Sequence, residues 1–279
     1  MTAGSLTFRG VSVGGVYTSI AVPGLGVLFD AGIPARSLAT IDTILLSHGH
    51  ADHIGALPAI LGIRALHGKR RPPRVVMPAE IVDDLRAALE PLARLMRFPA
   101  ELDAVGMKPG DEIELRGDLR VRAVRTFHPV PSLAYILLRR VAKLRPELHG
   151  LPSAEIAAMR RAGEDVATSE DRLELAYATD TLVTALDHAP DLYRARVLAM
   201  ECTFLDERKS LADARAGCHI HLDEVIERAD RFENEAILMM HFSQMYTPDE
   251  IAGILDRRVP PALRARIVPF VPDRPYWPG

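Results

Sequence analysis

A cluster of histidines and an aspartate is the feature of this 279-residue sequence best suited to chemistry. The segment "ILLSHGHADHIG" carries His48, His50, Asp52 and His53 directly behind an apolar run. In an extended segment residues i and i+2 point the same way, so His48 and His50 can reach one cation. Asp52 and His53 fall where a helix would begin, which turns them toward a second position. The spacing therefore indicates two metal ions, which need further ligands from elsewhere in the chain.

Three more candidate ligands each end an apolar, strand-like run. The runs "VRAVRTFH", "LELAYATD" and "AILMMH" end in His128, Asp180 and His241. In α/β proteins, ligand sites collect at the ends of strands. One such residue alone is more often a cap or a hydrogen-bonding partner, but together with the histidine cluster these three predict a single metal site.

The elements that must position these residues alternate between strands and helices. Buried, strand-like runs occur at residues 26–32, 41–47, 74–78, 173–180, 195–204 and 236–243. Helical patterns separate several of them, which predicts an α/β layered fold. From Asp111 to Leu138 three strand-like runs follow one another with turns between them, and this pattern predicts a β-meander.

Residues 139–172 interrupt the pattern between two strands. They contain no strand-like run, are rich in charge, glycine and proline, and include the helical segment "SAEIAAMRRAG". Four cations lie close together in the first part of this segment, namely Arg139, Arg140, Lys143 and Arg145. Such a stretch can bind phosphates or can be an ordinary solvated surface, and its charge alone leaves both interpretations open.

The composition is that of a globular protein with a sizeable apolar core, since 48% of the residues are hydrophobic and 25% are charged. The net charge of −3 gives no overall sign of nucleic-acid binding. No run approaches the ~18 apolar residues of a membrane span, and "MTAGSLTFRG" lacks the order of a secretory signal. Cys202 and Cys218 offer neither a disulfide framework nor a CxxC motif. We therefore expect a cytoplasmic protein with no membrane partner.

The motif "SHGHADH" resembles the HxHxDH signature of the metallo-β-lactamase superfamily. This resemblance implies an α/β fold, an αββα sandwich with a two-metal site between its halves, and a hydrolase of unspecified substrate. The segments "RTFHPVPSLAY", "YATDT", "MECTFLDE", "GCHIHLDEV" and "MMHFSQMYTPDEI" resemble, in order and spacing, the ribonuclease Z branch, especially its short plant-like forms. The resemblance covers nearly the whole chain. It implies one domain, residues 1–279, with residues 139–172 as an inserted, protruding arm.

The resemblance also implies two zinc ions, or manganese or another divalent metal ion in their place. Its ligand set places one ion on His48, His50 and His128, the other on Asp52, His53 and His241, and Asp180 between both. The implied role of Asp52 includes orienting the nucleophile.

His219 in "GCHIHLDEV" matches the catalytic histidine of the family that does not bind metal. Its neighbour His221 competes for that role, although the distance of 22 residues to His241 favours His219. Glu201 ends the run "ARVLAME", where it either orients His219 or is structural, and the sequence leaves both open.

The function implied by the resemblance is a zinc-dependent endoribonuclease that removes the 3′ trailer of precursor tRNA by attack of a metal-activated water. Arg139, Arg140, Lys143 and Arg145 of the arm would then bind the RNA, and a homodimer is usual for the short forms. The alternative is a hydrolase of small phosphodiesters or thioesters on the same scaffold. Met245 favours this alternative, because the family usually carries an arginine at that position of "HFSQMY".

Overall fold

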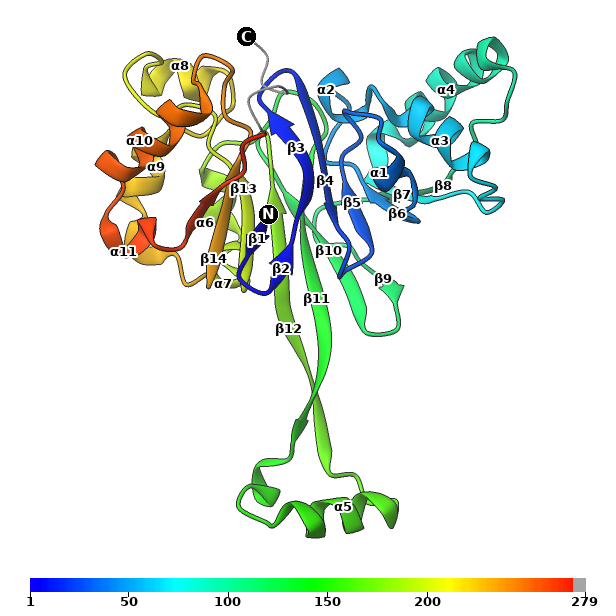
Figure 1. The fold of residues 1–279 in the computed structure, drawn as a ribbon, viewed down its shortest axis with the longest axis vertical. Coiled ribbons are helices and arrows are strands. Elements are labelled where there is room, and N and C mark those ends of the chain that lie inside the picture. Colours follow the sequence, from blue (N-terminus) through cyan, green and yellow to red (C-terminus); the bar gives the residue numbers. More distant parts are fainter. Residues whose placement is uncertain (273–279) are drawn as a thin grey trace.

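Two β-sheets pack face to face in this protein, and helices cover the outer face of each sheet (Figure 1). The structure is a computed structural model that describes residues 1–272, so residues 273–279 of the expected domain lie outside the described part. One sheet has the strand order β15-β14-β13-β12-β11-β10-β9, and the other has the order β3-β4-β5-β6-β7-β8. This arrangement confirms the expected αββα sandwich.

The six-stranded sheet consists of β3 (Arg9–Val13), β4 (Tyr17–Val22), β5 (Val27–Phe29), β6 (Thr43–Leu45), β7 (Arg74–Pro78) and β8 (Asp103–Met107). The seven-stranded sheet consists of β9 (Glu112–Arg116), β10 (Leu119–Arg125), β11 (Leu133–Leu144), β12 (Ala167–Ala178), β13 (Val197–Glu201), β14 (Ala236–Met240) and β15 (Ile267–Pro269). A small hairpin of β1 (Thr2–Ala3) and β2 (Leu6–Thr7) precedes both. Strands β9 to β11 pair antiparallel, as the expected meander requires.

The helices form two groups, with one further helix on the arm. Those of the first half are α1 (Arg36–Ala39), α2 (Ala51–Ile54), α3 (Leu57–Leu66) and α4 (Val82–Met96). Those of the second half are α6 (Thr184–His188), α7 (Asp191–Arg194), α8 (Leu211–Ala216), α9 (Leu222–Glu227), α10 (Pro248–Arg258) and α11 (Pro261–Arg264). The arm carries α5 (Ser153–Arg161). Among the described residues, no helix combines the length and apolar character that a membrane span requires.

The core has three apolar layers because side chains alternate along the strands. In β11, Tyr135 and Leu137 face the layer between the two sheets, whereas Ile136 and Leu138 face the helices of the second half. The third layer packs the outer face of the six-stranded sheet against α1, α3 and α4. The strands are thus apolar on both faces, as is expected for sheets covered on both sides.

Residues 139–172 form a narrow arm that projects far beyond the sheets (Figure 1). The expectation that they contain no strand is wrong, because β11 and β12 continue into the arm as a two-stranded ribbon. Arg140 to Leu144 pair in register with Asp171 to Ala167, beyond the last pairs that β10 and β13 make. The register shifts between Leu137 and Leu138, so a β-bulge lies where the ribbon leaves the sheet. The expected helix is present as α5, and it buries none of its side chains.

Candidate metal centre

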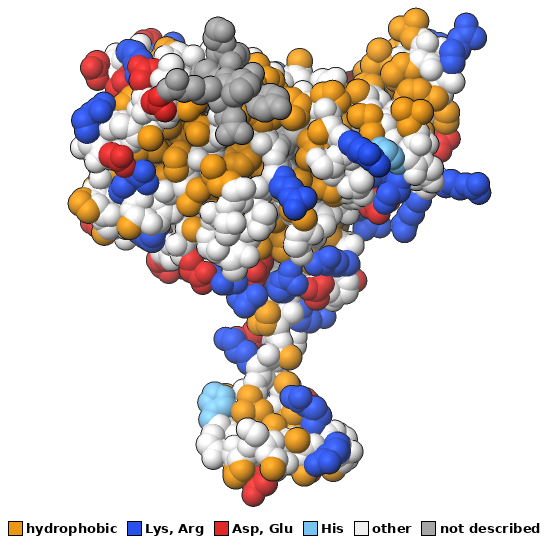
Figure 2. All heavy atoms as spheres, viewed as in Figure 1, with side chains coloured by type: hydrophobic (Ala, Val, Ile, Leu, Met, Phe, Trp, Pro, Cys, Tyr) orange, Lys and Arg blue, Asp and Glu red, His pale blue; other side chains and the backbone are white. Residues whose placement is uncertain are grey.

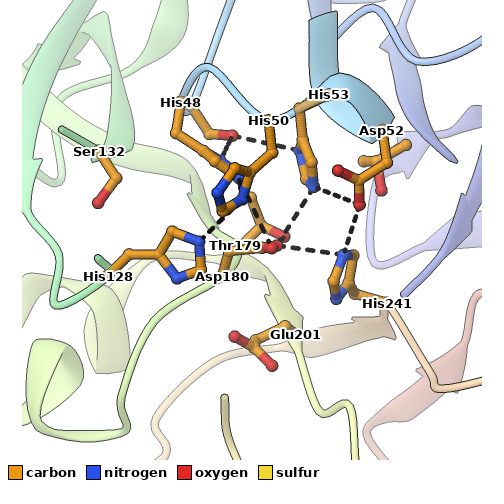
Figure 3. Close-up of polar contacts among 12 residues, drawn as sticks. His48, His50, Asp52, His53, His128, Ser132, Thr179, Asp180, Glu201 and His241 are labelled. Carbon is orange, nitrogen blue, oxygen red and sulfur yellow. Dashed lines mark hydrogen bonds and ion pairs between the residues drawn. The ribbon is translucent and has the colours of Figure 1, made fainter. Parts of the chain in front are cut away.

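The predicted ligands meet where the two sheets face each other, each delivered by a loop or helix that follows a strand (Figure 3). His48 and His50 follow β6, and His128 follows β10. The Nε2 atom of His48 lies 3.0 Å from Nδ1 of His50, which in turn lies 3.1 Å from Nε2 of His128. Together with Asp180, these three residues can place four ligand atoms around one position, within 4.8 Å of one another.

A second group of ligand atoms adjoins the first and shares Asp180 with it. Its other members are His241, which follows β14, together with Asp52 and His53 on α2. Oδ1 of Asp180 lies 3.4 Å from Nε2 of His53 and 3.2 Å from Nε2 of His241. Oδ2 of the same carboxylate lies 3.7 Å from Nε2 of His48 in the first group. The two oxygens of Asp180 therefore face one group each.

The donor atoms fit divalent metal ions. Nε2 of His53 and Nε2 of His241 are buried and have no hydrogen-bond partner within residues 1–272, although each lies beside a carboxylate of the cluster. Burial holds the pKa of His48 well below its ordinary value, so this imidazole is in the neutral form that binds metal. Burial raises the pKa of Asp180, but His241 and His53 outweigh it and hold that pKa below its ordinary value. Neutral imidazoles and ionised carboxylates are the ligands that zinc takes.

Asp30 supports this cluster from behind, and we did not predict it from the sequence. Its Oδ2 atom accepts hydrogen bonds from Nδ1 of His53 at 2.9 Å and from the Tyr177 hydroxyl at 2.6 Å. Its Oδ1 atom accepts from the backbone N–H of Ser47 at 2.7 Å. These bonds fix the ring of His53 with Nε2 pointing into the cluster. The signal for Asp30 is present in the sequence, because it directly follows the apolar run "GVLF".

The backbone at the site adopts unusual conformations. Asp30, Asp180 and His241 have positive φ angles of 55°, 44° and 60°, in the left-handed region that costs non-glycine residues free energy. Asp30 and His241 directly follow β5 and β14, and Asp180 lies two residues beyond β12. The chain thus turns sharply at each strand end, which aims the side chain across the gap between the sheets.

His219 lies beside the second ligand group and is held by Glu201. Its Nδ1 atom lies 3.2 Å from Oε1 of Glu201, and its ring stacks against that of His241 with centroids 5.6 Å apart. Glu201 is fully buried and also accepts hydrogen bonds from the backbone N–H groups of Thr181 and Ile220. Burial lowers the pKa of His219, but the Glu201 carboxylate outweighs it and raises that pKa to about 9. Of the two roles left open for Glu201, the geometry supports the one that orients His219.

His221 is engaged in the local structure instead. Its Nδ1 atom accepts a hydrogen bond from the backbone N–H of Asp223, and it forms a capping box with Glu224 at the start of α9. Its Nε2 atom donates to the backbone carbonyl of Asp206. Both ring nitrogens of His221 are therefore occupied, whereas His219 has only Nδ1 committed to Glu201.

The arm cations belong to the outer part of β11 and the residue after it, and Figure 2 shows Lys and Arg side chains along the ribbon and at its root. Three of the four predicted cations are paired with carboxylates. Arg139 pairs with Asp118, Lys143 with Glu170, and Arg145 with Asp165 and Glu147. Arg140 is exposed and forms no ion pair with any described residue. In the folded protein, acids from neighbouring strands and loops thus offset a stretch that is basic along the chain.

Met245 is 40% exposed in the loop after β14, close to Arg208. The guanidinium of Arg208 stacks on the ring of Tyr246 at 4.3 Å and donates to the Met245 carbonyl at 3.4 Å. It also pairs with Asp206 and Glu250. A cation is therefore present beside Met245, although two carboxylates already bind it.

Comparisons with known proteins agree with this geometry. Residues 21–242 match the family described as Beta-lactamase superfamily domain. The chain is 36% identical to tRNase Z TRZ1 of Arabidopsis thaliana over 262 residues, which cover 93% of this chain and 92% of that protein. It is 30% identical to the chloroplastic tRNase Z TRZ2 of the same plant, over 95% of this chain and 75% of that protein. Among solved structures, the short form of human tRNase Z matches with a TM-score of 0.58 at 17% identity, over 86% of this chain and 93% of that chain.

Proposed function

Because the chain belongs to the tRNase Z family of the β-lactamase superfamily, we propose that it is a zinc-dependent endoribonuclease that removes the 3′ trailer of precursor tRNA. The observation that carries this proposal is the position of Asp180. One carboxylate serves two ligand groups, and a histidine held by a buried glutamate lies beside them. Such a site suits hydrolysis of a phosphodiester, which needs both charge neutralisation and a proton donor.

The roles of the side chains follow from their positions. Two zinc ions, or manganese or another divalent metal ion in their place, would neutralise the scissile phosphate and make water acidic enough to attack it near neutral pH. Asp52 is the half-buried carboxylate of the ligand set, and it is placed to accept a proton from the attacking water. The Nδ1–H group of His219 donates a hydrogen bond to Glu201. The Nε2 atom is therefore the one that can protonate the leaving 3′ oxygen.

We assign recognition of the RNA to the arm within a single domain, residues 1–279. The arm projects from the body that holds the metal ligands, so it can contact a part of the RNA distant from the cut (Figure 1). Arg140 is the cation best placed to bind a phosphate, and Arg139, Lys143 and Arg145 would have to exchange carboxylate partners for phosphates. The homodimer and the cytoplasmic location stay predictions from the sequence, to be tested by light scattering and by cell fractionation.

Hydrolysis of small phosphodiesters or thioesters is the second candidate function. Met245 favours it, because Arg208 beside this residue is already bound by Asp206 and Glu250. The purified protein should be incubated with a precursor tRNA and, in parallel, with bis(p-nitrophenyl) phosphate. Release of a single 3′ trailer, resolved on a gel, supports the endoribonuclease, whereas hydrolysis of the small diester alone supports the second candidate.

A further inference from the structure

Phe204 is a half-buried aromatic residue whose backbone is fixed beside the metal centre. Its N–H donates to the Ile220 carbonyl at 3.3 Å, and its own carbonyl accepts from the N–H of Leu222 at 2.8 Å. The neighbouring residues Thr203 and Leu205 are buried, whereas the Phe204 side chain remains partly accessible. A large apolar side chain is thus held at the surface by a backbone that cannot easily move.

The ring of Phe204 lies next to the catalytic histidine. Its centroid is 6.1 Å from that of His219, with the two planes nearly perpendicular at 79°. The ring of His219 also stacks on that of His241, with centroids 5.6 Å apart. Phe204 and the ligand His241 therefore both contact the ring of the proposed proton donor.

A cation accompanies this ring. Nζ of Lys209 lies 5.5 Å from the Phe204 centroid, and among the described residues Lys209 forms no ion pair. The neighbouring Arg208, in contrast, is paired with two carboxylates. An accessible aromatic ring beside an unpaired cation is the combination that binds single-stranded nucleic acid, through stacking of a base and contact with a phosphate.

We propose that Phe204 stacks on the base of the nucleotide that carries the leaving 3′ oxygen, and that Lys209 binds a phosphate of the same strand. This inference rests on the proposed function, because it takes His219 as the donor to the leaving oxygen. The base of that nucleotide is one ribose away from the oxygen, and Phe204 contacts the histidine that would protonate this oxygen. Stacking on Phe204 should tolerate any base, since every base presents an aromatic face.

The test combines a protein variant with a modified substrate. Precursor tRNA is prepared with an abasic nucleotide directly 5′ of the cut, and kcat/KM is measured for the unmodified protein and for Phe204→Leu. Either change alone should lower kcat/KM by about tenfold or more, which corresponds to about 1.4 kcal/mol or more. Both changes together should lower kcat/KM no further than either change alone, because each removes the same stacking interaction. The proposal would be overturned if the two losses in kcat/KM multiplied in the combination. It would also be overturned if the unmodified protein cleaved the abasic substrate as well as the intact one.

Matched controls separate stacking from general damage. With an abasic nucleotide directly 3′ of the cut, the loss in kcat/KM from the missing base and the loss from Phe204→Leu should multiply, because they are independent. Phe98→Leu, which alters another half-buried phenylalanine, should leave the effect of the 5′ abasic nucleotide intact. Phe204→Tyr keeps an aromatic face, so its kcat/KM should still depend on the base 5′ of the cut. If a folded Phe204→Tyr protein no longer depended on this base, stacking would be contradicted. If the unmodified protein does not cleave intact precursor tRNA, the proposed function itself fails.

Lys209 is tested by the salt dependence of RNA binding. Lys209→Gln should weaken binding and lower the slope of log K against log salt by about 0.7, because it removes a single phosphate interaction. Lys69→Gln is the control, since Lys69 pairs with Asp42 near the start of β6 while the metal ligands follow its end. Equal slopes for Lys209→Gln and the unmodified protein would show that Lys209 binds no phosphate of the RNA.

Discussion

The carboxylate of Asp30 lies 2.9 Å from Nδ1 of His53, on the side of the imidazole opposite the ligand cluster. Asp30→Asn keeps the size of the side chain and tolerates the positive φ of this position, but it removes the charge that orients His53. We expect zinc affinity to fall by about 10- to 100-fold with the fold retained. Competition with a chelating dye measures the affinity, and circular dichroism checks the fold. An unchanged affinity would show that Asp30 has only a structural role.

Metal content should follow the two ligand groups. The unmodified protein, purified without chelator, should contain close to two metal ions per chain. His50→Ala and His241→Ala should each lose one, whereas Asp180→Ala should lose both because its carboxylate faces both groups. Elemental analysis gives the counts. His67→Ala is the control, since this exposed histidine lies outside the cluster, and a loss of metal there would contradict the ligand set.

His219 and His221 should separate cleanly by mutation. His219→Ala should lower turnover by the ~10²–10⁴-fold typical of a lost acid–base group, with metal content unchanged. His221→Ala should instead lower the free energy of unfolding by about 1 kcal/mol, because it removes a helix cap. Initial rates and thermal melting measure the two effects. Similar losses of turnover in both variants would mean that the roles are wrongly assigned.

Deletion of the arm should abolish recognition of tRNA but retain hydrolysis of a small phosphodiester. Arg139 and Arg172 face each other across the ribbon, so residues 140–171 can be replaced by Asn-Gly, which suits a two-residue hairpin turn. Processing of precursor tRNA should be lost, whereas hydrolysis of bis(p-nitrophenyl) phosphate should persist because the metal ligands and His219 lie elsewhere. Retained tRNA processing by the shortened protein would exclude the arm as an RNA-binding element.

The charges of the arm offer a finer test. Replacing Arg139, Arg140, Lys143 and Arg145 with glutamine should weaken RNA binding and flatten its salt dependence by about one unit of slope for each phosphate that is no longer bound. Arg140→Gln alone should account for one such unit, because this arginine is paired with no carboxylate in the described part of the chain. The double variant Lys143→Gln, Glu170→Gln removes an ion pair without changing the net charge, and it should flatten the slope only if Lys143 exchanges Glu170 for a phosphate.

The sequence predicted which residues meet at the site, because these residues coincide with the ends of apolar strands. His128, Asp180 and His241 could be found by this criterion alone, and the structure places them together. Asp30 satisfies the same criterion but falls within the strand-like run 26–32, and the sequence analysis does not single it out. Its role depends on contact with Tyr177 and His53, and such contacts between distant segments are not visible in a single sequence.

The ribbon of the arm was missed for a physical reason. Strands are recognised by the alternation of apolar and polar residues, which arises because one face of a sheet is buried. Residues 139–144 and 167–172 have solvent on both faces, so most of their side chains are exposed and half of them are charged. Their pairing is an extension of the buried pairs of β11 and β12, and the sequence of the arm itself carries no sign of it.

This exposed ribbon also bears on the solubility of the protein. Beyond the body, β11 and β12 each have one neighbour, so their outer edges present backbone donors and acceptors to which another extended chain can pair. Lys143 and Glu170 place charge along these edges, and charged side chains oppose edge-to-edge association. Neutralising the arm therefore removes a protection against aggregation together with the cations, and variants of this kind should be kept dilute and checked by size-exclusion chromatography.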